Sequence, residues 1–135
     1  MSHTHTPDLS GKQREIKFRI YIHSSKRMID AVGFCYEGVS QIRIWYRKGE
    51  MLYNESFLIV DTDALQFTNL LDKNGKEVYE GDRIRIYWRA DDDYTDENIS
   101  YDEKYCYYKY GNNPICELFD PETPFEVIGN IYETN

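Results

Sequence analysis

The chain has no long apolar run and no cysteine pair with the spacing that metal or redox sites use. No stretch approaches the roughly 18 apolar residues of a membrane-spanning helix. The N-terminus lacks the charged-then-apolar order of a secretion signal. The three cysteines, Cys35, Cys106 and Cys116, are odd in number, and no two of them have C-x-x-C spacing. We therefore expect a soluble, intracellular protein with reduced thiols and no membrane partner.

Residues suited to catalysis are scarce as well. His23 is the one histidine beyond the extreme N-terminus, so a Cys–His nucleophilic site has little support. No glycine-rich phosphate loop precedes a helix, which removes the basis for nucleotide hydrolysis. Asp91, Asp93 and Thr95 have the spacing of the first ligands in a calcium loop, but Asp96 stands where that loop needs glycine. We expect no enzyme activity, no cofactor and no metal site.

Positive charge is in deficit. The 24 Asp and Glu outnumber the 16 Lys and Arg, and the net charge of −8 opposes general attraction to nucleic acid or anionic lipid. Aromatic residues are abundant, with 13 Tyr and 6 Phe, and such residues favour strands over helices. A length of 135 residues suits one domain. We expect a disordered tail over 1–13 and a single mainly β domain over 14–135.

Alternating apolar residues predict most of the strands. In 14–22 an apolar residue recurs at every second position, as in a strand with one buried face. Similar patterns predict further strands over 28–36 with a break at Gly33, 41–47, 51–60, 83–88, 105–110, and 125–132 with a bulge at Gly129. Segment 61–67 fits a short helical turn or extended structure, and we favour the extended form. The segment around 90–104 is predicted to be an exposed acidic loop, because its like charges repel.

Two turns organise the centre of the chain. Asn74-Gly75 separates two apolar-bearing runs, and both residues tolerate positive φ, so a tight primed hairpin turn is predicted. Glu80-Gly81-Asp82 predicts a second turn. There Gly81 takes a conformation that is strained for residues with a Cβ, and Asp82 accepts hydrogen bonds from backbone amides. These structural turns specify shape rather than chemistry.

Three blocks of sequence stand out: REIKFR at 14–19, QFTNL and DKNGKEVYEGD within 66–82, and FEVIGNIYE at 125–133. Together they resemble the YopX family of phage and prophage proteins. The resemblance implies an SH3-like β-barrel with additional N-terminal strands, built around the Gly81-Asp82 turn, and an origin in a phage or prophage of a bacterium. It supplies no catalytic or binding residues. Asn69 stands where the family usually has glycine, and asparagine also tolerates positive φ.

Two functions fit these observations, and the first is protein binding. A small non-enzymatic β module would bind a phage or host protein in the cytoplasm of the bacterial host, through an open sheet edge, an aromatic surface or the acidic loop. Imitation of the DNA phosphate line by that loop is a sharper form of this hypothesis. Exposed edges also favour a homo-oligomer. The candidate partner-binding residues are Trp45, Tyr87, Trp88, Asp91, Asp92, Asp93, Tyr107 and Tyr108.

The alternative is a nucleic-acid-binding SH3-like barrel. Arg83, Arg85 and Arg89 share one face if their strand is regular, and they would contact phosphates while aromatic side chains stack on bases. The excess of negative charge argues against this function, so nucleic acid ranks second among the expected partners.

Overall fold

The residues that the computed structural model describes, 15–88, 93–120 and 122–133, are mostly β structure. Within these ranges the strands are β1 Phe18–Ile22, β2 Arg27–Ala31, β3 Gly33–Glu37, β4 Gln41–Lys48, β5 Met51–Leu58, β6 Thr62–Leu71, β7 Glu77–Tyr79, β8 Asp82–Trp88, β9 Asp93–Asp102, β10 Tyr107–Tyr110, β11 Asn113–Pro114 and β12 Phe125–Asn130. The helical elements of the same ranges are two short 3-10 turns, η1 Ile59–Asp61 and η2 Ile115–Phe119. The expected mainly β class with little helix is therefore confirmed.

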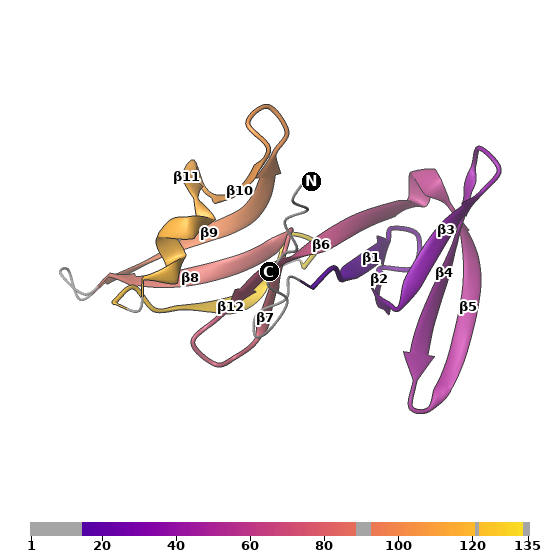
Figure 1. Ribbon diagram of the computed structural model, residues 1–135, viewed down its shortest axis with the longest axis horizontal. Coiled ribbons are helices and arrows are strands. Elements are labelled where there is room, and N and C mark those ends of the chain that lie inside the picture. The colour runs from indigo at the N-terminus through magenta and orange to yellow at the C-terminus, as the bar shows by residue number, and fades with distance from the viewer. Residues whose placement is uncertain (1–14, 89–92, 121, 134–135) are drawn as a thin grey trace, which may run out of the picture.

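Three sheets form two lobes that share one long strand (Figure 1). The strand orders are β2-β1-β6-β7, β3-β4-β5 and β11-β10-β9-β8-β12. The first half of β6 pairs with β1 and the second half with β7, so β6 runs from an N-terminal lobe of β1–β5 into a C-terminal lobe of β7–β12. The buried apolar side chains accordingly form two clusters, one in each lobe. A single domain over 14–135 stays a prediction, and the tail over 1–13 lies outside the described residues.

The N-terminal lobe packs the β1–β2 hairpin against the three-stranded β3–β4–β5 sheet. The break expected at Gly33 within 28–36 falls at Val32, where the chain bends and passes from one sheet to the other, so the two parts are separate strands and not one returning strand. The Val32 amide donates to the Trp45 carbonyl oxygen at 2.8 Å, which directs the chain toward β4. The buried core of the lobe consists of Ile20, Ile22, Ile29, Ile42 and Ile44.

The C-terminal lobe is a curled five-stranded sheet around the second core. Ile84 and Ile86 of β8 and Ile99 of β9 are essentially inaccessible to solvent. The acidic loop expected around 90–104 is wrong over most of its length, because that length forms β9; residues 90–92 lie outside the described ranges. Strand β9 pairs with β8 on one side and with β10 on the other. β8 pairs with residues 93–98 and β10 with residues 99–102, and this pairing outweighs the low strand propensity of aspartate and glutamate.

The hairpin between β6 and β7 has a three-residue loop and not the expected two-residue primed turn. Gly75 has a φ of +79°, whereas Asn74 does not have a positive φ. The Asp72 amide donates to the Lys76 carbonyl oxygen and the Gly75 amide donates to the Asp72 carbonyl oxygen, each at 2.9 Å. The cause is the buried Asp72 carboxylate, which accepts the Asn74 and Lys76 amides at 2.8 Å. It also accepts the Val127 amide at 2.9 Å and so fixes the loop against β12.

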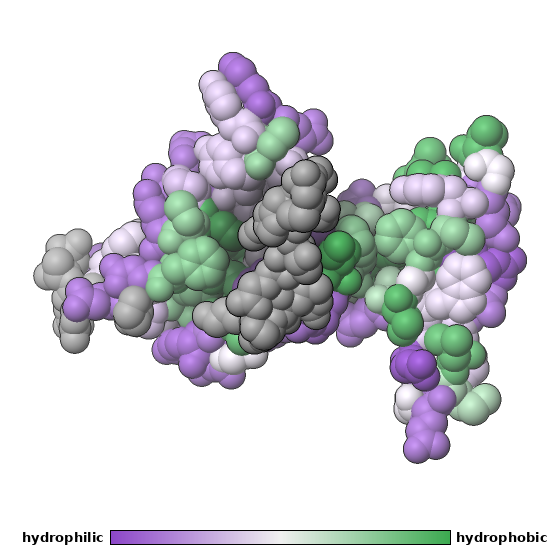
Figure 2. Space-filling model, in the orientation of Figure 1, coloured by the Kyte–Doolittle hydropathy of each residue, from purple (hydrophilic) through white to green (hydrophobic). Residues whose placement is uncertain are grey.

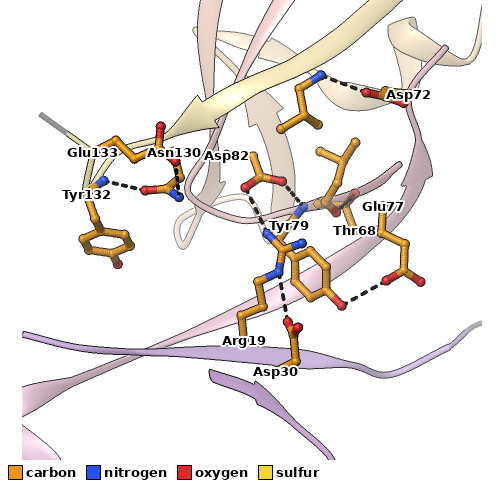
Figure 3. A network of polar contacts seen from close by, with 12 residues as sticks. Arg19, Asp30, Thr68, Asp72, Glu77, Tyr79, Asp82, Asn130, Tyr132 and Glu133 are labelled. Atoms are coloured by element: carbon orange, nitrogen blue, oxygen red, sulfur yellow. Dashed lines mark hydrogen bonds and ion pairs between the residues drawn. The ribbon is translucent and has the colours of Figure 1, made fainter. Parts of the chain in front are cut away.

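The Gly81-Asp82 turn lies where the two lobes meet, and Figure 3 shows the polar contacts around Asp82. Gly81 has a φ of +87°, and Asp82 Oδ2 accepts the Tyr79 amide at 2.8 Å, so both predicted roles are confirmed. Asp82 Oδ1 lies 3.5 Å from Nη1 of Arg19, whose Nε lies 3.3 Å from Asp30. The Arg19 guanidinium also lies 3.9 Å from the centroid of the Tyr79 ring. The turn therefore connects β1, β2, β7 and β8.

Three smaller expectations for β6 and β12 are confirmed. Segment 61–67 is extended from its second residue onward. Asn69 has a φ of +68° at a register irregularity of β6, and its side chain exchanges two hydrogen bonds with the backbone of Glu15. The register of β12 against β8 shifts between Val127 and Gly129, which is the predicted bulge.

Candidate functional site at the open edge of β5

Strand β5 is an outer strand of its sheet, and no described residue pairs with its free side. Its register against β4 is set by a two-residue turn over 49–50. Backbone hydrogen bonding alternates along an antiparallel pair, so every second residue of β5 is bonded to β4. The Ile59 amide, just beyond the strand, donates to the Ser40 carbonyl oxygen at 2.9 Å and fixes which residues these are. The residues whose backbone N–H and C=O groups point away from β4, here called the outward residues of β5, are therefore Leu52, Asn54, Ser56 and Leu58.

Among the outer strands of the described chain, β5 is the longest and the least protected. Strands β2 and β3 have five residues each, β7 has three, and β11 has two and includes a proline. Strand β12 has a bulge, and its free side is covered by the β6–β7 loop, where the Lys73 amide donates to the Phe125 carbonyl oxygen at 2.9 Å. Short length, proline, bulges and covering loops are the usual protections of an outer strand. The eight residues of β5 have no proline and no register shift.

Apolar side chains gather on the surface of the same lobe, as the space-filling view shows (Figure 2). Met51, Leu52 and Leu58 of β5 are each more than half exposed. Val39 in the β3–β4 turn and Val60 just after β5 are almost fully exposed. Exposed apolar side chains beside unpaired backbone groups are typical of a surface that binds an extended protein segment.

The outer face of the sheet has a polar network around Arg43. Arg43 donates through Nε to Glu37 at 2.9 Å and through Nη1 to the Asn54 side chain. Ser56 Oγ donates to the other carboxylate oxygen of Glu37 at 2.6 Å. The hydrogen bonds from Ser56 and then Arg43 lower the pKa of Glu37. Because the network joins β3, β4 and β5, it fixes the outer strand without covering its backbone edge.

On the opposite face, Glu55 of β5 is held by β2 and β4. Arg27 Nη2 lies 2.8 Å from Glu55 Oε2, and the Tyr46 hydroxyl donates to the same oxygen at 2.5 Å. Both partners lower the pKa of Glu55, Arg27 more than Tyr46. Glu55 is the one charged residue of β5, and its carboxylate is paired with Arg27 of the same lobe. The edge therefore has no charge of its own to repel an added strand.

The predicted partner-binding aromatic residues do not gather at this edge. Trp45 lies in β4 and shares the outer face of the sheet with the outward residues of β5. Trp88 packs against the core of the C-terminal lobe, and Tyr87 lies on the outer face of β8. A separate cleft of the C-terminal lobe is lined by Tyr107 and Tyr108. Of the predicted aromatic residues, Trp45 alone lies in the sheet of the candidate site.

The predicted acidic and basic sites lie side by side. Arg85 donates through Nε and Nη2 to the two oxygens of Asp96, at 2.8 and 3.1 Å. This pairing raises the pKa of Arg85 and lowers the pKa of Asp96. Arg83 donates to Asn98 Oδ1 at 3.4 Å, and Asp93 is the exposed first residue of β9. The predicted residues outside the described ranges are Arg89, Asp91 and Asp92. The arginine face expected to contact phosphates therefore already holds a carboxylate of this chain.

Three features of the described ranges bear on metals, membranes and thiols. Residues 15–88, 93–120 and 122–133 contain no group of three or more His, Cys, Asp or Glu placed to hold a metal ion. None of their helical turns is long and apolar enough to cross a membrane. Cys35, Cys106 and Cys116 are exposed and are not in disulfides.

The sequence pattern predicts an open sheet edge in general but does not single out β5. The alternation over 51–60 predicts a strand that pairs back onto the one before it, and this pairing is confirmed. Its outer position depends on the order of strands in the sheet, which local alternation does not reveal. The absence of lysine and proline from 51–58 does not signal an outer position either, because outer strands usually carry one of these residues.

These features define a two-lobed, mainly β protein whose candidate site is an open sheet edge. The YopX protein family matches residues 17–135, which is most of the chain, and the chain belongs to this family. The match confirms the resemblance carried by the three sequence blocks.

A solved structure with a similar fold is that of protein EF1440 from Enterococcus faecalis. The TM-score is 0.61 at 19% sequence identity, and the alignment covers 90% of this chain and 96% of that chain. At this identity the likeness concerns the fold alone. A search of the curated proteins finds no match.

Proposed function

We propose that this chain is a non-enzymatic phage or prophage accessory protein that works as a small β interaction module. It binds a phage or host protein in the cytoplasm of the bacterial host by adding a strand of that partner to the free edge of β5. The curled five-stranded sheet, interpreted as an SH3-like barrel, is the scaffold that holds the N-terminal lobe. The observation that carries the proposal is an unprotected eight-residue outer strand with exposed leucines.

The expected partner segment is extended and has apolar side chains at alternate positions. Leu52 and Leu58 project from the outer face of the sheet, where every second side chain of an added strand would contact them. Tyr53 and Phe57 project from the opposite face and would contact the remaining side chains. The backbone hydrogen bonds of the outward residues supply affinity, and these side chains supply selectivity.

The nucleic-acid alternative has weaker support. Arg85 is paired with Asp96 and lies opposite Glu126 of β12, so a phosphate would have to displace a carboxylate. The net charge of −8 adds an unfavourable approach to any polyanion. Protein binding therefore explains the described surface better.

Affinity capture from host lysate tests the proposal with the wild type, Ser56→Pro and Ser56→Ala. Proline at this outward position removes an N–H of the free edge and leaves the β4–β5 hydrogen bonds in place. Alanine keeps the N–H, and both variants lose the hydroxyl bond to Glu37, so Ser56→Ala is the matched control. We expect the wild type and Ser56→Ala to capture the same protein, and Ser56→Pro to lose it while keeping the wild-type circular dichroism spectrum.

Equal capture by all three proteins contradicts strand addition at β5, and so does a blank with the wild type. Sedimentation of the purified proteins supplies a further outcome. A wild-type dimer that Ser56→Pro converts to a monomer assigns the edge to a second copy of this chain and overturns the binding of a different protein there.

A further inference from the structure

A cleft of about 420 Å³ lies in the C-terminal lobe, apart from the edge of β5. The β9–β10 hairpin supplies one part of its wall, and β6 with the β7–β8 turn supplies the other. The described residues that line the cleft are Gln66, Glu80, Tyr101, Cys106, Tyr107 and Tyr108. Three tyrosines and one carboxylate therefore surround a space of the size that a long side chain needs.

The tyrosine wall is held in place by the turn between β9 and β10. Asp102 Oδ1 accepts the Tyr105 amide at 3.0 Å, and the Asp102 carbonyl oxygen accepts the Cys106 amide at 2.7 Å. The rings of Tyr101 and Tyr108, which are paired across the two strands, meet edge to face with centroids 5.1 Å apart. The wall is thus fixed by backbone pairing and by the turn.

Glu80 is the charged group of the cleft. Its amide donates to the Gln66 carbonyl oxygen at 2.9 Å, which fixes its backbone against β6. Burial raises the pKa of Glu80, and the nearby carboxylates of Asp63 and Glu103 act in the same direction. Among the described residues, no Lys or Arg lies within ion-pair distance of the Glu80 carboxylate. A cation in the cleft would offset both the desolvation and the like charges.

Elsewhere in the described chain, neighbouring tyrosine and carboxylate side chains bind a cationic side chain. At four places in the described chain a cationic side chain lies over a tyrosine ring, 3.9 to 5.1 Å from its centroid, and beside a carboxylate. The sets are Arg19 with Tyr79 and Asp82, Arg27 with Tyr46 and Glu55, Lys73 with Tyr87 and Glu126, and Arg85 with Tyr94 and Asp96. Ring quadrupole and carboxylate both attract the cation. The cleft is likewise lined by tyrosines and a carboxylate, but no described Lys or Arg pairs with that carboxylate, which belongs to Glu80.

We propose that this cleft binds the guanidinium or ammonium group of a basic side chain of another protein. The cation lies against the tyrosine wall and pairs with Glu80. Asp63, Glu103 and the net charge of −8 favour the approach of a basic segment over a neutral or acidic one. The site is separate from β5, so this proposal and the proposed function can fail independently.

An NMR titration of the ¹⁵N-labelled full chain tests the cleft with three blocked tripeptides, Gly-Arg-Gly, Gly-Lys-Gly and Gly-norleucine-Gly. We expect saturable shifts of the backbone amides of Glu80, Tyr101 and Tyr108 with at least one basic peptide, and weaker binding as salt is added. The arginine and lysine arms distinguish a guanidinium from an ammonium ligand. The norleucine peptide has similar length without charge and should cause no saturable shift at these amides.

The variant Glu80→Gln should weaken binding of the basic peptide about tenfold, because a charge-assisted contact is lost. Glu50→Gln, in the β4–β5 turn, makes the same change of net charge at a distance and should bind like the wild type. Three results would overturn the proposal: equal shifts with the norleucine peptide, unchanged affinity in Glu80→Gln, or no saturable shift of the cleft amides with either basic peptide.

Discussion

The Arg19 guanidinium and the buried Asp82 carboxylate bring strand β1 of the N-terminal lobe to the first residue of β8 in the C-terminal lobe (Figure 3). Asp82 is 2% exposed. Burial raises the pKa of Asp82, although the Tyr79 amide and the charge of Arg19 act in the opposite direction. The junction of the lobes therefore contains a carboxylate that burial makes costly to ionise. The turn needs this carboxylate because it accepts the Tyr79 amide and contacts Arg19.

Two replacements of Asp82 should distinguish the contribution of its hydrogen bond to the Tyr79 amide from the contribution of its charge. Asp82→Ala should lower the free energy of unfolding by about 2–4 kcal/mol, because the Tyr79 amide loses its acceptor and Arg19 loses one of two carboxylates. Asp82→Asn keeps an acceptor, removes the buried charge and should cost about 1 kcal/mol. Urea unfolding measures both variants. Equal losses would show that the bond to the Tyr79 amide does not hold the turn.

Gly81→Ala should lower the free energy of unfolding by about 1–3 kcal/mol. A φ of +87° is unfavourable for alanine, and this backbone strain is the cause, because the added Cβ would make only ordinary van der Waals contact with the Leu65 side chain at 3.4 Å. Gly33→Ala is the matched control, because no atom lies within 4 Å of its added Cβ and its φ is not positive. The control should change stability by less than about 0.5 kcal/mol. Thermal unfolding that ranks the two variants equally would contradict this geometry.

Local alternation predicts most strands of this fold, because one buried face imposes a period of two wherever the partner lies. Long-range pairing limits the prediction. By composition, the acidic residues of β9 resemble a solvated loop. Pairing with β8, however, places Asp96 opposite Arg85, and the arginine neutralises a carboxylate that the neighbouring acidic residues would repel. The two candidate sites drawn from these residues are thus one ion-paired surface.

The Asn74-Gly75 hairpin shows the same limit over a shorter range. The dipeptide predicts a two-residue turn, but the Asp72 carboxylate selects the longer loop and also binds the Val127 amide of β12. The candidate site follows the same rule, since the pattern of 51–58 predicts the strand and the sheet order alone makes it an edge. The cleft residues Gln66 and Glu80 likewise meet the tyrosines through long-range contacts, because in the β7–β8 turn the Glu80 amide donates to Gln66 of β6 and the Gly81 amide donates to Ile99 of β9.

The stability of Glu80→Gln relative to the wild type should rise with pH. Because the pKa of Glu80 is raised above its ordinary 4.5, the folded state keeps a proton at a pH where the unfolded state has lost it. The stability that this proton contributes is present below the ordinary pKa and is lost as the pH rises through the raised one. The glutamine variant has no such loss. Urea unfolding from about pH 3 to about pH 7 should therefore favour the variant increasingly.

Glu55→Gln is the control of opposite sign in the same experiment. Arg27 and Tyr46 lower the pKa of Glu55, so its contribution to stability is present above the ordinary pKa and is lost as the pH falls through the lowered one. Glu55→Gln should be least stable relative to the wild type near neutral pH and should approach it in acid. Parallel pH curves for the two variants would contradict both assignments.

Amide hydrogen exchange measured by NMR on the full chain, alone and with its captured partner, tests strand addition at β5 most directly. In the free protein, the amides of the outward residues should exchange faster than those of Tyr53, Glu55 and Phe57, which are bonded to β4. Partner binding should slow the outward amides and leave the other three nearly unchanged, because an added strand pairs with every second residue. Equal slowing of both sets, or slowing confined to the C-terminal lobe, would contradict the account.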